Sequence, residues 1–174
     1  TVNFDASHFN ECDPPEIQGE DYGTNAERVR RCRLVGLPDL LQEDPFVRDQ
    51  MVAFLQDLSD MGVAGLRLDV AKHMFPLDLD AILSRVTGLD YVFGEVPSYG
   101  GEVVLFEDYT PYFDVTEFRY KADLQNIFMG ENRRLAELQN IGQSFGYVST
   151  TEAVVFVDNH DTQRASDARL IFRA

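Results

Sequence analysis

Three apolar segments of the sequence are each followed by carboxylates. Asp69 follows one segment, Glu95 follows a second, and Asp158 and Asp161 follow a third, with His160 between them. If the three segments are parallel strands, their carboxyl ends share one face, and that face holds the active site of a parallel β/α barrel. Glycoside hydrolysis needs one carboxylate as nucleophile and one carboxylic acid as proton donor.

A third carboxylate has a clear use in such a site. The acid must keep its proton near neutral pH, and a nearby negative charge favours that. The third group can supply this charge and also bind sugar hydroxyls. The alternative for any one of these residues is a loop carboxylate or a helix cap. The residues alone therefore predict a hydrolase with a carboxylate triad, and they do not select the sugar.

The elements that must position these residues can be read from hydrophobic periodicity. Asp44-Pro45 caps a predicted helix over 45–61, in which apolar residues recur every three or four positions before Gly62. Further helices are predicted at about 79–86, at 121–129 and 132–141, and from about Asp167.

The predicted strands are short and apolar. They are 63–68, which reads as a buried strand, 91–93, 114–118 and 153–157, and none of them reads as an edge. Strands that alternate with helices indicate parallel β/α units. Residues 1–45, in contrast, have many turn formers and no clear period, which predicts a loop-rich region.

Composition and charge restrict the partners. The 174 residues contain 30 Asp and Glu against 15 Lys and Arg, a net charge of −15. Such a chain repels nucleic acid and anionic membranes, whereas a neutral carbohydrate is unaffected. No segment has the length of a membrane span, the first residues do not read as a signal peptide, and both ends are predicted to be cut from a longer chain.

The two cysteines, Cys12 and Cys32, enclose a segment rich in Pro, Gly and acidic residues. Such a loop has little core of its own, so a disulfide would stabilise it. The alternative is two unrelated thiols, and the spacing does not decide between them.

The segments around the carboxylates resemble the α-amylase family of glycoside hydrolases, and the animal-type members in particular. The resemblance covers nearly the whole chain. It is carried by Gly65-Leu66-Arg67-Leu68-Asp69-Val70-Ala71-Lys72-His73, Gly94-Glu95-Val96 and Phe156-Val157-Asp158-Asn159-His160-Asp161-Thr162-Gln163-Arg164. Gly94 departs from the vertebrate pattern, which has a larger polar residue there, and this favours an invertebrate-like member or a divergent paralogue.

The resemblance implies a role for each carboxylate. Asp69 is similar to the family nucleophile, Glu95 to the acid that later activates water, and Asp161 to the carboxylate that holds and distorts the sugar. The reaction would retain the α configuration. The implied substrate-binding residues are Lys72, His73 and His160.

The resemblance also implies two ions. The family binds chloride through residues that match Arg67 and Asn159, and an anion there would offset the effect of a bare guanidinium on a neighbouring acid. The alternative is that Arg67 simply pairs with a carboxylate. Calcium, which prefers oxygen ligands, would be held by the Asp39 carboxylate and by the backbone carbonyls of Arg30 and His73.

The fold class implied is α/β, as part of a (β/α)8 TIM barrel. Residues 46–174 would be the central part of the catalytic barrel, about strands 4–7. Residues 1–45 would be the end of the loop-rich, calcium-binding protruding domain, where the family has a disulfide at the positions of Cys12 and Cys32. Strands 1–3 and 8 are absent from this stretch, so the isolated chain is expected to be inactive.

The function implied is that of a secreted, extracellular α-amylase, monomeric as a whole protein, that hydrolyses α-1,4-glucosidic bonds inside starch, glycogen and malto-oligosaccharides. The first alternative is an α-glucosidase of the same family, but the Cys12–Cys32 segment and the chloride-type Arg67 and Asn159 favour an amylase. The second is a non-catalytic, glucan-binding relative. Such proteins usually lack a catalytic carboxylate, and here all three are present.

Overall fold

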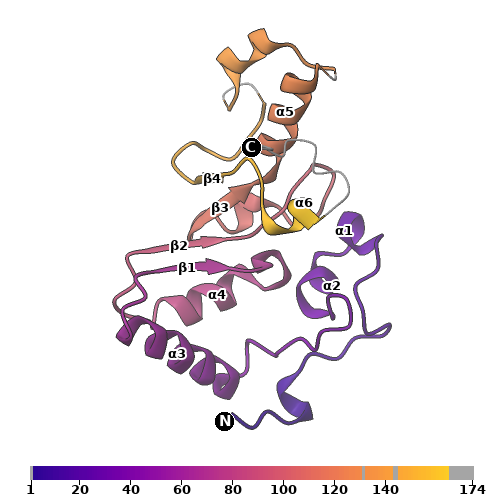
Figure 1. Cartoon of the computed structure of the whole chain (residues 1–174). Helices are drawn as coiled ribbons and strands as arrows, with labels where there is room; N and C mark the ends of the chain where they lie inside the picture. The colour runs from indigo at the N-terminus through magenta and orange to yellow at the C-terminus, as the bar shows by residue number, and fades with distance from the viewer. Residues whose placement is uncertain (1, 131, 143–144, 165–174) are drawn as a thin grey trace.

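The computed structural model describes residues 2–130, 132–142 and 145–164, and its centre is a parallel sheet with the strand order β1-β2-β3-β4 (Figure 1). The strands are β1 Gly65–Leu68, β2 Tyr91–Gly94, β3 Asp114–Glu117 and β4 Ala153–Val155. The register pairs Leu68 with Gly94 and Gly94 with Val115, so the carboxyl ends of neighbouring strands lie side by side. The predicted parallel α/β fold is confirmed.

The helices begin and end for local reasons. Helix α3, Pro45–Asp60, matches its prediction to within one residue, because Asp44 Oδ1 accepts hydrogen bonds from the amides of Phe46 and Val47 at 2.8 and 3.1 Å. The chain then turns at Gly62, which has a φ of +99°. The other α-helices beside the sheet are α4 Pro76–Leu83, α5 Phe118–Met129 and α6, which is described over His160–Arg164.

Residues 2–44 form the predicted loop-rich region, with the short helices α1 Asp21–Thr24 and α2 Ala26–Arg31. The Cys12–Cys32 disulfide is present, with a Cα–Cα distance of 5.7 Å. Val29 of α2 is fully buried in the same core cluster as Ala71 and Val115 of β3. The loop-rich region therefore shares one hydrophobic core with the sheet. The proposed domain boundary at residue 45 stays a prediction.

Three local predictions were wrong. Residues 132–141 do not form an α-helix. Asn132 has a left-handed φ of +61°, which is incompatible with a right-handed helix, and only a 3-10 helix follows at Leu135–Asn140. β1 and β4 are the two outer strands of the described sheet, so the prediction that no strand is an edge does not hold. For the same reason β1 is not buried, and its residues alternate between exposed and half-buried. The predicted helix from Asp167 lies outside the described residues.

The core lies between the sheet, the loop-rich region and the segment that joins β2 to β3. Its buried side chains are Val29, Ala71, Leu79, Val96, Val104, Tyr109, Phe113, Val115 and Val148. Within the described part of the chain, no helix has the length and apolar character that crossing a membrane requires.

Candidate active site

The first two predicted catalytic carboxylates lie at the ends of adjacent strands. Asp69 follows β1 and Glu95 follows β2, and the Glu95 amide donates to the Leu68 carbonyl at 2.9 Å. Arg67 joins them: its guanidinium contacts Asp69 Oδ1 at 2.5 Å and Glu95 Oε1 at 2.9 Å. The Glu95 residue is only 5% exposed, whereas the Asp69 side chain is 68% exposed. The site thus presents one buried and one accessible carboxylate.

Backbone groups hold Glu95 from a second direction. The Val70 amide donates to Glu95 Oε2 at 3.1 Å, and the Lys72 amide donates to the Glu95 carbonyl at 3.2 Å. Val70 has a φ of +42°, in the left-handed region that β-branched residues rarely adopt. Val70 directly follows the predicted nucleophile Asp69, and its amide faces Glu95. Strained backbone conformations of this kind are often found at functional sites.

Asp161 and His160 lie in α6, past the end of β4. Their side chains are 66% and 54% exposed, and His160 Nε2 is 3.4 Å from Asp161 Oδ1. His160 lines a pocket of about 180 Å³ together with Arg67, Glu95 and Asn159. The structure therefore brings the two predicted chloride-binding residues to one pocket with the predicted acid. In the described chain the Arg67 guanidinium pairs with the carboxylates of Asp69 and Glu95.

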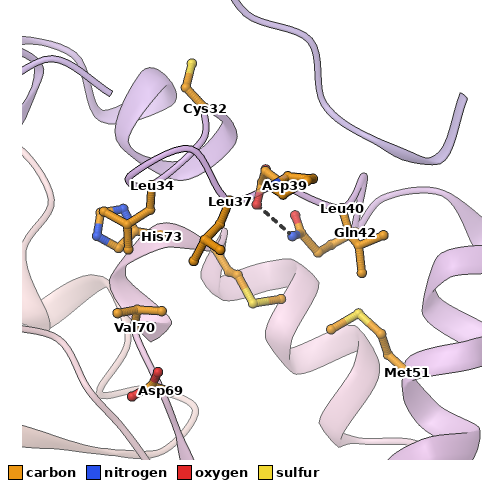
Figure 2. Close-up of a pocket in the computed structure, with 12 residues that line it drawn as sticks. Cys32, Leu34, Leu37, Asp39, Leu40, Gln42, Met51, Asp69, Val70 and His73 are labelled. Atoms are coloured by element: carbon orange, nitrogen blue, oxygen red, sulfur yellow. Dashed lines mark hydrogen bonds between the residues drawn. The ribbon is translucent and has the colours of Figure 1, made fainter. Parts of the chain in front are cut away.

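A neighbouring pocket of about 250 Å³ lies between the loop-rich region and the turn after β1, and Asp39, Asp69, Val70 and His73 line it (Figure 2). Asp39 accepts hydrogen bonds from Asn10 Nδ2 at 2.7 Å and Gln42 Nε2 at 3.4 Å. Burial nevertheless raises the pKa of the Asp39 carboxyl to about 6. A partly buried carboxylate of this kind is suited to a cation.

The side chains of the other predicted calcium-site residues make contacts of their own. The His73 ring contacts the Val29 carbonyl through Nδ1 at 2.8 Å, and burial lowers the pKa of His73. Arg30 pairs with Asp108 at 2.5 Å and donates to Tyr109 Oη at 3.2 Å. Over residues 2–130, 132–142 and 145–164, no group of three or more His, Cys, Asp and Glu side chains could hold a metal ion. A calcium ion here would need the predicted backbone carbonyls besides Asp39.

Lys72 lies inside the protein. The residue is 4% exposed, its ammonium pairs with Glu102 and donates to the Pro97 carbonyl at 2.6 Å, and it lies 5.5 Å from the centre of the Tyr22 ring. Its role in this structure is to join the loop-rich region to the segment after β2. The sequence analysis missed Glu102, and its only local signal is the preceding pair Gly100-Gly101, whose positive φ values mark a sharp turn.

Comparison with known proteins gives relatives over most of the chain. The chain is 42% identical over 154 residues to an α-amylase of Phaedon cochleariae, which covers 82% of this chain and 32% of that protein. It is 41% identical over 160 residues to the pancreatic α-amylase of Struthio camelus, with 86% and 32% covered. The chain thus spans about a third of the length of these relatives. No protein-family model matches the sequence.

Solved structures agree with this result. Wild-type α-amylase I from Eisenia fetida superposes with a TM-score of 0.87 at 40% identity, over 92% of this chain and 35% of that one. A mutant of the same enzyme, solved as a complex with maltohexaose, superposes with a TM-score of 0.88. The predicted resemblance to animal-type α-amylases is confirmed. Since beetle and bird enzymes match about equally well, the invertebrate-like character indicated by Gly94 stays a prediction.

Proposed function

Because this chain resembles animal α-amylases over 82–96% of its length, we propose that the protein to which it belongs is an α-amylase that cleaves internal α-1,4-glucosidic bonds of starch and glycogen. The observation that carries the proposal is the pair of carboxylates, Asp69 and Glu95, at the ends of adjacent parallel strands and joined by Arg67. The complex of the Eisenia fetida relative with maltohexaose supports a malto-oligosaccharide as ligand.

The proposed mechanism uses the difference in exposure between the two carboxylates. The accessible Asp69 attacks the anomeric carbon of the sugar while Glu95 gives its proton to the departing glycosidic oxygen, so that one C–O bond forms as another breaks. Glu95 then takes a proton from water, the water oxygen attacks the same carbon, and Asp69 leaves. Two displacements at one carbon retain the α configuration.

The remaining site residues act on binding. Asp161 and His160 are exposed beside the pocket that Glu95 lines, where they can bind hydroxyls of the sugar at the cleavage point. His73 and Lys72 contribute to the sugar sites beyond it. The Lys72 ammonium is already paired with Glu102, so it would have to bind the sugar while keeping that ion pair. Its contribution to sugar binding is therefore weaker than that of His73.

Chloride fits the chemistry of the second pocket. The Arg67 guanidinium and the Asn159 amide are both hydrogen-bond donors, and both line the pocket beside Glu95. When bound, chloride would supply a negative charge beside the arginine and so favour the protonated form of a neighbouring acid.

Asp39 and His73, two of the residues expected to hold calcium, both line the first pocket. The Asp39 carboxylate would hold the ion together with the backbone carbonyls of His73 and of Arg30, which is not among the residues lining that pocket, and the bound ion would link the loop-rich region to the turn that carries Asp69. The Cys12–Cys32 disulfide supports a secreted, extracellular protein, since disulfides persist in oxidising compartments. We propose a monomer that binds neither nucleic acid nor membranes, in keeping with its net charge of −15.

The test is an assay of reducing ends released from soluble starch by the full-length protein, in calcium and with or without chloride. Glu95→Gln should lose activity on the order of 10³-fold or more, because the proton donor is gone. Glu152→Gln is the matched control: it makes the same chemical change just before β4, at the opposite end of the strands, and should retain activity.

Other outcomes identify other functions. Hydrolysis of maltose without hydrolysis of starch would assign an α-glucosidase. Binding of glucan with no hydrolysis of either substrate would assign a non-catalytic relative. Equal activity of Glu95→Gln and the unmodified protein would show that the acid lies elsewhere.

A further inference from the structure

Gly94, which directly precedes Glu95, has no space for a side chain. A Cβ atom on Gly94 would lie 3.0 Å from Ala71 Cβ and 3.1 Å from Phe113 Cδ2, and closer still to Phe113 Cε2. The backbone of Gly94 is not in the left-handed region, so the restriction is one of space alone. The residue is buried at the end of β2, where the Phe113 ring occupies the volume that a side chain would need.

The Phe113 ring, which closes most of this space, is packed on its other side against Tyr109. Phe113 is 7% exposed, and its ring centre lies 6.1 Å from that of Tyr109, which is fully buried. Tyr109 Oη lies 3.0 and 2.9 Å from the carbonyl oxygens of Lys72 and Met74, which share its one hydroxyl proton. The ring cannot swing into solvent, and in a packed core an added methyl group is accommodated by shifts of the backbone.

Such shifts would reach both predicted catalytic carboxylates. Moving the end of β2 displaces Glu95, which follows Gly94 in the chain. Moving Ala71 displaces the segment that directly follows Asp69, including the Val70 amide that donates to Glu95 Oε2 at 3.1 Å. Phe113 therefore lies at a point where packing determines the distance between the proton donor and the nucleophile.

We propose that Gly94 and Phe113 form a size-matched pair of positioning residues that sets the place of the catalytic acid Glu95 relative to Asp69. The inference rests on the proposed amylase function, because it assigns Glu95 as the proton donor. Neither residue touches the substrate, and both act through the backbone of β2.

The experiment compares four variants of the full-length protein: Gly94→Ala, Phe113→Leu, the two combined, and the control Gly65→Ala. Each is assayed on soluble starch and on a malto-oligosaccharide with a dinitrophenyl leaving group. Starch needs a proton on its departing oxygen, whereas dinitrophenolate leaves without one. The ratio of the two kcat/KM values therefore reports the position of the acid, and a general loss of folded protein would not change it.

We expect Gly94→Ala to lower kcat/KM on starch on the order of 10²-fold, the size of effect that follows displacement of a catalytic group by about 1 Å. The loss on the dinitrophenyl substrate should be about tenfold or less. Phe113→Leu removes the ring atoms that would collide with the new methyl group, so the combined variant should regain at least about tenfold on starch relative to Gly94→Ala.

Gly65→Ala is the matched control, because it adds a methyl group to the adjacent strand β1 at its far end, where the Cβ would lie 3.3 Å from the Tyr91 carbonyl oxygen. It should leave the ratio of the two substrates unchanged, even where it lowers the thermal stability. If Gly94→Ala does not fold, Phe113→Leu alone decides the question: it must reduce activity on starch more than on the dinitrophenyl substrate, because the support for β2 is weakened.

Equal losses on both substrates in Gly94→Ala, or no recovery in the combined variant, would overturn the inference. These failures are distinct from failure of the proposed function. If the unmodified protein does not hydrolyse starch, both the proposed function and the positioning role are excluded. If it does so and Gly94→Ala matches it on both substrates, only the positioning role is lost.

Discussion

Glu95 and Asp161 belong to the same candidate site but lie in very different surroundings. The Glu95 residue is 5% exposed, and Arg67 and the Val70 amide each contact one of its carboxylate oxygens. The Asp161 side chain is 66% exposed, and His160 Nε2 lies 3.4 Å from its Oδ1.

The difference follows from the elements that carry the two residues. Glu95 follows a strand whose neighbours on both sides are paired in register, so ladder hydrogen bonds fix its backbone. Asp161 lies in the first turn of α6, past the end of β4 and outside the strand ladder. We infer that the β1–β2 side of the site places the reacting groups, whereas the α6 side can adjust to the sugar.

The largest expected effect separates the β1–β2 side of the site, which carries the reacting groups, from the α6 side. Asp69→Asn should lower kcat/KM on starch on the order of 10⁵-fold, because the covalent intermediate cannot form. Asp161→Asn should lower it on the order of 10³-fold, as for the loss of one group that stabilises the transition state. Initial rates on soluble starch measure both, and a greater loss for Asp161→Asn would reverse the comparison.

A smaller effect tests how the β1–β2 side of the site, which carries Asp69 and Glu95, is held in place. Arg67→Gln removes the link between Asp69 and Glu95 and should lower kcat on the order of 10²-fold, while abolishing any activation by chloride. Arg85→Gln is the matched control, because its ion pair with Asp49 is exposed and remote from the strand ends. A chloride titration of starch hydrolysis is the measurement, and activation that survives in Arg67→Gln would exclude this residue as the chloride ligand.

A substitution on the α6 side should mainly change the KM for the substrate. His160→Gln should raise KM for malto-oligosaccharides about tenfold and change kcat less, since it removes a hydrogen bond to the sugar. His8→Gln makes the same change in the loop-rich region, where His8 contacts Asp5, and should leave both constants as they are. Steady-state kinetics over a range of oligosaccharide concentrations separate the two. A loss confined to kcat would place His160 with the reacting groups.

The smallest effect concerns the pocket beneath the turn that carries Asp69. The pKa of Asp39 is raised to about 6 by burial, from an ordinary value near 3.8. Without calcium, the contribution of Asp39 to stability is fully present below about pH 3.8 and is lost as the pH rises through about 6, because the folded state binds the proton more tightly. After allowance for solvent screening, this loss should be about 1 kcal/mol.

Calcium should remove that loss above pH 6 and bind more weakly below it, where protons compete for Asp39. Asp39→Asn should abolish both the pH dependence and the stabilisation by calcium. Thermal unfolding of the full-length protein between pH 4 and 8, with calcium or with a chelator, measures the effect. Stabilisation by calcium that is unchanged in Asp39→Asn would place the ion elsewhere.

Much of this site could be predicted because its signals are local. The Asp44-Pro45 cap marked the start of α3, and the apolar segments before Asp69 and Glu95 marked two strands that end together. The helix predicted at 132–141 failed because periodicity carries no information about the left-handed conformation of Asn132. The family resemblance, rather than the spacing, paired Cys12 with Cys32, and the structure agrees.

The sequence by itself determined which residues could do chemistry and on which strands they lie, because strand alternation and helix caps are decided within a few residues. Only the tertiary structure decided that Arg67 joins two carboxylates, that Lys72 is buried against Glu102, and that the Phe113 ring closes the space beside Gly94. The contacts of Arg67 with Glu95, of Lys72 with Glu102 and of Gly94 with Phe113 join residues 28, 30 and 19 positions apart. They depend on strand register and on how the loop-rich region packs, and both emerge only when the whole core is assembled.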